Sequence, residues 1–319
     1  MESKKSAPEA LSPSLLADEI AELKKQKNAV IMAHYYQRDE VKEIADFIGD
    51  SLALARKAAQ TDADVIVMCG VHFMGETAKI LCPDRTVLIP DPEAGCSLAD
   101  SCDPEEFGKF VAEHPDHTVI SYVNTSAAVK ALTDIVVTSG NARKIVESLP
   151  ADEKIIFGPD HNLGEYINSV TGRQMLLWNG ACHVHDRFSL EGIARLKKEH
   201  PGAKVLVHPE CRRPLQIIAD KVGSTAALLD FARADEAKEY IVVTESGILF
   251  DMQRECPEKT FIPAPAEDAE CQCNECDYMK MITLRKLRDC LRDGKPEIHV
   301  DPEVARKALR PIERMLELS

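Results

Sequence analysis

A hydrophobic run that ends in two polar residues, with one spacer between them, occurs three times along the chain. The copies are VIMAHYY from residue 30, TVISYVN from residue 118 and KVLVHPE from residue 204. Their first polar residues are 88 and 86 residues apart (positions 34, 122 and 208), and the second polar residues keep that spacing. Short apolar runs of this kind are typical of buried parallel strands. The polar residues, named the strand-end pairs below, are His34 and Tyr36, Tyr122 and Asn124, and His208 and Glu210.

The position of these pairs indicates one shared site. In an open parallel sheet the ligand lies beyond the carboxyl ends of the strands, which is where the polar residues fall. A chain that repeats catalytic residue types there three times is expected to build a single site from three copies of one unit.

The rest of each copy alternates between strands and helices, which favours α/β units with parallel sheets. The first copy predicts a helix over 15–27 before its strand and another helix over 41–48. Further strands are predicted over 64–68 and 86–90 in the first copy, 154–157 and 174–177 in the second, and 239–243 and 260–262 in the third.

The predicted organisation is therefore a short lead-in and three α/β repeats. The polar lead-in over residues 1–14 is expected to be disordered. The repeats are expected over 15–115, 116–200 and 201–289, and helices over 290–319 are expected to pack back on the first repeat.

Composition narrows the classes of function. The 319-residue chain has a net charge of −14, which argues against nucleic-acid binding, because a phosphate backbone requires a basic face. No apolar run reaches the roughly 20 residues of a membrane span, and the start of the chain lacks the apolar core of a secretion signal. We therefore expect a cytoplasmic protein whose 11 cysteines are reduced thiols or metal ligands.

Three serines recur in phase with the strand-end pairs. Ser51, Ser139 and Ser224 are 88 and 85 residues apart, and each is predicted to open a helix. Such a serine can cap the helix, or the same helix start can hold phosphate or carboxylate oxygens. Thr225 would add a second hydroxyl to the third copy.

A cysteine after the last strand of each copy is the third recurring feature. Cys96 and Cys182 provide the first two, and the third is one of Cys271, Cys273 and Cys276. Three converging thiolates suit a [4Fe–4S] cluster with one iron free to act as a Lewis acid. Cys273 and Cys276 also form a C-x-x-C that could hold zinc, but the following residues offer no second half of a zinc site.

The strand-end pairs offer acid–base chemistry beside such a cluster. Glu210 is a candidate general base or acid. His34 and His208 are candidate proton shuttles or hydrogen-bond donors to a carboxylate. Tyr36, Tyr122 and Asn124 can hydrogen-bond a small polar substrate. His185, three residues after Cys182, could reach a substrate or a cluster sulfur.

At this point the chain resembles the quinolinate synthase family over nearly its whole length, from about residue 15 to residue 318. The most specific segments are AHYY from residue 33, IADFIGDS from 44, GVHFM from 70, YVN from 122, GPDHNLG from 158, VHPEC from 207 and VGST from 222.

The resemblance implies three pseudo-threefold-related αβα domains with short parallel sheets around a central active site. It implies condensation of iminoaspartate with dihydroxyacetone phosphate to quinolinate, phosphate and water in NAD biosynthesis. Coupling to an L-aspartate oxidase and a monomeric or homodimeric state are expected.

The resemblance also assigns residues. It makes Cys96, Cys182 and Cys276 the ligands of a [4Fe–4S] cluster, since the residues after Cys276 match those after the family's third ligand. Glu210 and Tyr36 are the candidates for proton transfer, with His34, His208 and Tyr122 beside them. The implied substrate contacts are His34, Tyr36, Ser51, Phe73, Tyr122, Asn124, Ser139, His185, His208, Glu210, Ser224 and Thr225.

Two other classes of function stay open. One is an aconitase-like iron–sulfur hydro-lyase that acts on another small acid. The other is an iron–sulfur redox sensor, which would not need the strand-end pairs.

Overall fold

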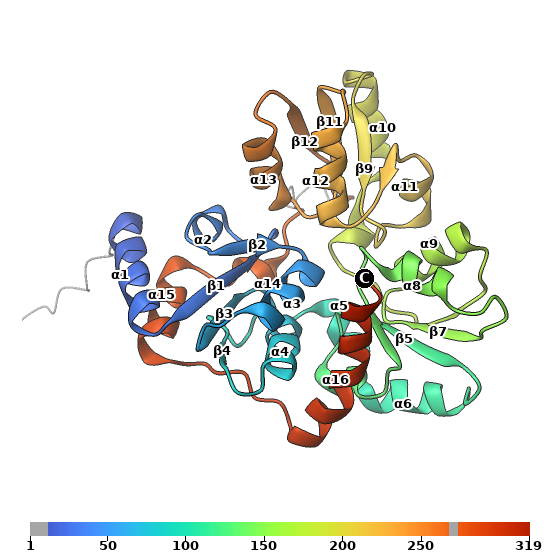
Figure 1. The fold of residues 1–319 in the computed structure, drawn as a ribbon. Helices are drawn as coiled ribbons and strands as arrows, with labels where there is room; N and C mark the ends of the chain where they lie inside the picture. Colours follow the sequence, from blue (N-terminus) through green and yellow to red (C-terminus); the bar gives the residue numbers. More distant parts are fainter. Residues whose placement is uncertain (1–11, 268–273) are drawn as a thin grey trace, which may run out of the picture.

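Three four-stranded parallel sheets form the framework of the protein in its computed structural model, which describes residues 12–267 and 274–319. Figure 1 shows the sheets as three separate groups around the middle of the molecule, with helices on their faces. This arrangement confirms the predicted α/β fold class of three αβα units with short parallel sheets. Part of the predicted lead-in (residues 1–11), Cys271 and Cys273 lie outside the described residues.

All three sheets share one strand order, in which the first strand of the unit lies between the second and the third. The first sheet runs β2 (Phe47–Gly49), β1 (Ala29–His34), β3 (Val65–Cys69) and β4 (Thr86–Leu88). The second runs β6 (Ile135–Val137), β5 (Thr118–Tyr122), β7 (Ile155–Gly158) and β8 (Leu176–Leu177). The third runs β10 (Lys221–Val222), β9 (Lys204–Val207), β11 (Glu239–Val243) and β12 (Thr260–Pro263).

Helices connect the strands and cover the sheets. In the first unit they are α1 (Pro13–Gln26), α2 (Asp39–Glu43), α3 (Ser51–Gln60), α4 (His72–Leu81) and α5 (Ser97–Asp100). Next come α6 (Pro104–Ala112), α7 (Ala127–Lys130), α8 (Ala142–Ser148), α9 (His161–Thr171), the short 3₁₀ helix η1 (His185–Arg187) and α10 (Leu190–Glu199). The last are α11 (Arg213–Ile217), α12 (Thr225–Ala234), α13 (Ile248–Glu255), α14 (Asp277–Lys280), α15 (Leu284–Asp293) and α16 (Pro302–Glu317).

The second strand of each sheet was missed by the sequence pattern. The helix predicted over 41–48 is wrong beyond residue 43, because α2 ends there and residues 47–49 form β2. An aspartate fixes each such connection: the carboxylates of Asp46, Asp134 and Asp220 accept the backbone N–H of the neighbouring first strand at 2.9, 2.8 and 2.8 Å. Strands of two or three residues are too short to give a periodic signal.

The helix before each first strand belongs with the sheet that follows it. Phe107 of α6 packs into a core cluster with residues of β5 and β7, and Ile193 of α10 packs with β9 and β11. In the same way, Ile20 of α1 packs with β1 and β3. The expected divisions at residues 115/116 and 200/201 place α6 and α10 in the preceding repeat, whereas both helices pack on the sheet that follows them.

The C-terminal helices pack in two places. Helix α15, of which only the last residues fall in the range 290–319, packs beside α1 on the first unit. Helix α16, which was expected on the first unit alone, contacts β6 and α7 of the second unit as well as α4 of the first. Among the described residues, no helix combines the length and the apolar character that a membrane crossing requires.

Candidate active site

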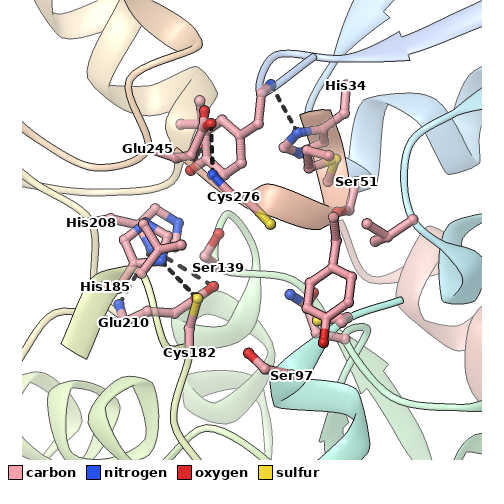
Figure 2. A pocket seen from close by; sticks show the side chains of 18 of the residues that line it. His34, Ser51, Ser97, Ser139, Cys182, His185, His208, Glu210, Glu245 and Cys276 are labelled. Carbon is pink, nitrogen blue, oxygen red and sulfur yellow. Dashed lines mark hydrogen bonds and ion pairs between the residues drawn. The ribbon is translucent and has the colours of Figure 1, made fainter. Parts of the chain in front are cut away.

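A cavity lies where the carboxyl ends of β1, β5 and β9 meet, and all three strand-end pairs line it. It offers about 70 Å³ to the centres of water molecules, which is room for several of them. Every predicted site residue except Ser224 lines this cavity, including Cys96, Cys182 and Cys276. Figure 2 shows side chains from all three units directed toward the same space.

Each cysteine loop is attached to its unit by an equivalent backbone hydrogen bond. The N–H groups of His72, His161 and Ser246 donate to the carbonyl oxygens of residues 94, 180 and 274 at 2.7, 2.8 and 3.0 Å. Each acceptor stands two residues before a cysteine that lines the cavity, namely Cys96, Cys182 and Cys276. The three loops therefore have the same register, and Cys276 holds the third equivalent position.

The three thiols lie at the starts of short helical segments. Cys96 and Cys276 are the N-cap residues of α5 and α14, and Cys182 stands just before η1. Burial raises the pKa of Cys96 to about 12 and that of Cys276 to about 11, and it raises the pKa of Cys182 well above its ordinary value. Backbone N–H groups at the helix starts oppose this shift, so each thiolate has donors in place but needs a cation to form readily.

His34 and His208 are held in one tautomer by their own chains. The Nδ1 atom of His34 accepts the backbone N–H of Tyr36 at 3.2 Å, and that of His208 accepts the N–H of Glu210 at 3.3 Å. Burial lowers the pKa of both histidines to about 3. Each imidazole is therefore neutral at pH 7 with its proton on Nε2, which makes it a hydrogen-bond donor.

Glu210 is a buried carboxylate with three neighbours. The Tyr122 hydroxyl donates to its Oε1 at 2.5 Å, and His185 Nδ1 lies 3.0 Å from its Oε2. Burial alone would raise the pKa of Glu210, but His185 and His208 together with the hydrogen bond from Tyr122 outweigh it and lower the pKa to about 2. Glu210 is therefore ionised at pH 7, and its oxygens can accept hydrogen bonds or a proton.

A chain of hydrogen bonds joins Glu210 to Tyr36. From Glu210 it passes through His185, whose Nε2 lies 2.9 Å from the hydroxyl of Thr244. The Thr244 hydroxyl lies 2.8 Å from the Tyr36 hydroxyl, which also contacts the Thr225 hydroxyl at 2.7 Å. The two residues predicted to transfer protons are thus linked through buried side chains.

The serines differ in their local roles. Ser224 caps α12, because its hydroxyl accepts the N–H of Ala227 at 3.3 Å. Ser51 opens α3 as predicted, but Asp50 provides its cap, and α8 starts after Asn141 rather than at Ser139. Ser51 and Ser139 are instead directed at the cavity.

Glu245 is a site residue that the sequence pattern missed. Its Oε1 accepts the backbone N–H of Cys276 at 3.1 Å and pairs with Lys280 Nζ at 3.1 Å, and its Oε2 accepts the N–H of Gly247 at 2.7 Å. Lys280 also donates to the carbonyl of Tyr36 at 2.7 Å. Glu245 and Thr244 follow β11, a third strand, whereas the repeated polar pairs follow the first strands; a search of the other strand ends could have found them.

Two sets of donors in the cavity could hold metal. Cys182, His185 and Glu210 have ligand atoms within 4.8 Å of one another. However, Glu210 and Thr244 occupy both ring nitrogens of His185, which leaves no free lone pair for a metal. The three equivalent cysteines are therefore the better donor set, and they suit an iron–sulfur cluster.

Comparison with known proteins gives one consistent result. The family model described as "Quinolinate synthetase A protein" matches residues 18–317. A protein of Synechococcus sp. named quinolinate synthase is 55% identical over 307 residues, 96% of either chain. Proteins of the same name are 54% identical in Thermosynechococcus vestitus, with 98% of both chains covered, and in Chloroherpeton thalassium, with 98% of this chain and 97% of the relative covered.

Proposed function

Because the chain belongs to the quinolinate synthetase A protein family, we propose that it condenses iminoaspartate with dihydroxyacetone phosphate to give quinolinate, phosphate and water. The chain is an enzyme of this family, and its product would enter NAD biosynthesis. The observation that carries the proposal is that three strand-end pairs and three equivalent cysteines, from three units, line one cavity.

We propose that Cys96, Cys182 and Cys276 hold a [4Fe–4S] cluster. Their shared backbone register and the N–H donors at each thiol support this set. When bound, such a cluster supplies a Lewis-acidic iron that can bind a substrate oxygen or nitrogen and assist the loss of water.

The residues of the chain would bind the substrates and move their protons. The Oδ1 atom of Asn124 is buried and has no hydrogen-bond partner in the described part of the chain, so a substrate N–H or O–H would satisfy it. The Nε2–H groups of His34 and His208 would donate to carboxylate oxygens, and Ser51, Ser139 and Thr225 would add hydroxyl donors. Ser224 caps α12 and would thereby position Thr225, the first residue of that helix.

Glu210 would act as the general base, since it is ionised and faces the cavity. Burial raises the pKa of both Tyr36 and Tyr122 and keeps the phenols protonated, so each would donate a hydrogen bond to the substrate and a proton only to a strongly basic atom of an intermediate. Phe73 would exclude water from the reacting imine at the wall of the cavity.

The test is an anaerobic assay on protein reconstituted with iron and sulfide. Quinolinate should form, with one phosphate released per quinolinate, only when iminoaspartate and dihydroxyacetone phosphate are both present. Omission of either substrate is the control. Iron-loaded protein that forms no quinolinate from the two substrates would contradict the proposal.

In the cell we propose a cytoplasmic enzyme that receives iminoaspartate from an L-aspartate oxidase.

Replacing Glu245 with glutamine should weaken retention of the cluster. The amide cannot accept both N–H groups that the carboxylate accepts, and Lys280 loses its charged partner. Residues that orient metal ligands typically contribute 10- to 100-fold to metal affinity, so we expect loss of iron to a chelator at least about tenfold faster. The measurement is iron bound per protein against time.

Asp251→Asn is the matched control for this variant. Asp251 forms a buried ion pair with Lys42 of the first unit, but its described contacts do not include Cys276. Equal loss of iron in both variants would show that the interface between the units, rather than the position of Cys276, governs retention.

A further inference from the structure

Three buried side chains occupy equivalent positions that the proposed mechanism does not use. Lys42, Lys130 and Gln216 each stand six residues after the second member of a strand-end pair, and they are 88 and 86 residues apart. They are 1%, 0% and 6% exposed, respectively. A buried long polar side chain requires hydrogen-bond partners, so its contacts indicate why it is there.

Each side chain donates to backbone carbonyls beside the site residue of its own unit. Gln216 Nε2 donates to the carbonyls on both sides of Glu210, those of Pro209 at 2.9 Å and Cys211 at 2.7 Å. Lys42 Nζ lies 3.3 Å from the carbonyl of residue 35, which precedes Tyr36. Lys130 donates to the carbonyl of residue 125, which follows Asn124.

The same three side chains also reach the neighbouring unit at an equivalent place, the start of the helix after its third strand. Lys42 donates to the carbonyl of Gly247 before α13 at 2.6 Å and pairs with Asp251 at 2.9 Å. Gln216 Nε2 lies 3.3 Å from the carbonyl of Asn162 in α9. Lys130 Nζ lies 5.3 Å from the centre of the Phe73 ring in α4.

The contacts form a closed ring. The first unit reaches the third, the third reaches the second and the second reaches the first, which is the head-to-tail pattern that closes three copies around an axis. Two members of the ring are lysines and one is glutamine. What they share is a donor at the end of a long side chain.

We propose that these three side chains are positioning residues, each of which fixes the second polar residue of its strand-end pair against the neighbouring unit. Glu210, Tyr36 and Asn124 come from different units, so their mutual distances depend on how the units meet. A donor that binds both the site loop and the neighbouring helix start sets that distance directly. The kinetic consequence rests on the proposed function, whereas the structural consequence does not.

The pseudo-symmetry provides a sharp test at Gln216. Gln216→Met keeps the length of the side chain but removes its donor, whereas Gln216→Lys places there the residue that the other two units use. Gln253→Met is the matched control, because the Gln253 amide also donates to two carbonyls, those of Pro257 and Lys259, in a loop without site residues.

We expect Gln216→Met to lower kcat for quinolinate formation by about 10- to 100-fold, since a displacement of about 1 Å can cost that much. The KM values and the iron content should stay near wild type, because none of the three proposed ligands lies in this loop. The backbone amides of His208, Glu210 and Cys211 should exchange hydrogen faster. Gln216→Lys and Gln253→Met should match wild type in kcat and in exchange at 208–211.

The inference is overturned if Gln216→Met keeps the kcat and the hydrogen exchange of the wild type. It is also overturned if Gln216→Lys folds but loses kcat and exchanges as fast as Gln216→Met. If Gln216→Met does not fold, Gln216→Lys decides: near wild-type exchange and kcat support the inference, and a large loss overturns it. If the wild type forms no quinolinate, the proposed function fails, while the exchange comparison still tests the positioning role.

Discussion

Replacing Glu210 with glutamine is expected to lower kcat at least about 100-fold, the lower range for removal of a general acid–base group. Glutamine keeps the shape of the side chain and can still accept from Tyr122, but it cannot take a proton at pH 7. The carboxylate is ionised at pH 7 because its contacts with His185 and Tyr122 outweigh the effect of burial on its pKa. The measurement is the rate of quinolinate formation in anaerobic assays, together with iron content.

Glu239→Gln is the control for this change. Glu239 also pairs with a histidine, His200 Nδ1 at 3.2 Å, but it lies at the start of β11, away from the carboxyl end that forms the site. We expect wild-type rates for this variant. A Glu210→Gln protein that keeps its iron and loses less than about threefold in kcat would exclude Glu210 as the base. It would also revive the redox-sensor interpretation, which does not need this residue.

The part of the site that sequence could predict is the part fixed by the strands. A buried parallel strand is recognisable from its apolar run, and its carboxyl end gives the position of the residue that follows. This is why His34, Tyr122 and His208 could be placed together before any coordinates were known, and why all three line one cavity. The resemblance to a known family then added Phe73, which the repeat alone did not assign as a substrate contact.

The parts that sequence could not predict depend on tertiary contacts. Three cysteines occur within six residues near position 276, and they lie 89, 91 and 94 residues after Cys182 (271−182, 273−182, 276−182), so none keeps the 85- to 88-residue spacing of the repeat. The backbone bond from Ser246 to residue 274 supports the choice of Cys276. Likewise, Glu245 accepts the backbone N–H of Cys276, which is 31 residues away in the sequence. No local sequence pattern reveals that contact.

The repeat explains why a small enzyme can build a crowded site. Each unit contributes a strand-end pair, a cysteine loop and a helix start, so the cavity gains three sets of polar groups without long loops. The chemistry has diverged while the framework has not: the first members of the pairs are His, Tyr and His, and the second members are Tyr, Asn and Glu. Only Glu210 among them carries a charge at pH 7, which favours the third unit as the source of the proposed base.

Replacing any one of Cys96, Cys182 and Cys276 with alanine is expected to remove most of the iron and to lower quinolinate formation at least about 1,000-fold. A Lewis-acidic metal contributes several kcal/mol to transition-state stabilisation, and about 4 kcal/mol corresponds to that factor. The three variants should have the same effect, because the loops are equivalent and a cluster with two remaining thiolates is poorly held. The measurements are iron and sulfide per protein, visible absorption and activity.

Cys290→Ala is the matched control, because Cys290 is a buried cysteine of α15 that packs in the core of the first unit rather than in the cavity. It should keep its iron and its activity.

Cys271→Ala and Cys273→Ala test whether either of these cysteines is the third ligand in place of Cys276, and both variants should retain the cluster. If Cys273→Ala loses iron while Cys276→Ala keeps it, the third ligand is Cys273, and the shared register of the three loops does not determine which thiol binds. If all the single variants keep full iron, the cluster is held elsewhere, and the convergence of Cys96, Cys182 and Cys276 on one cavity has another cause.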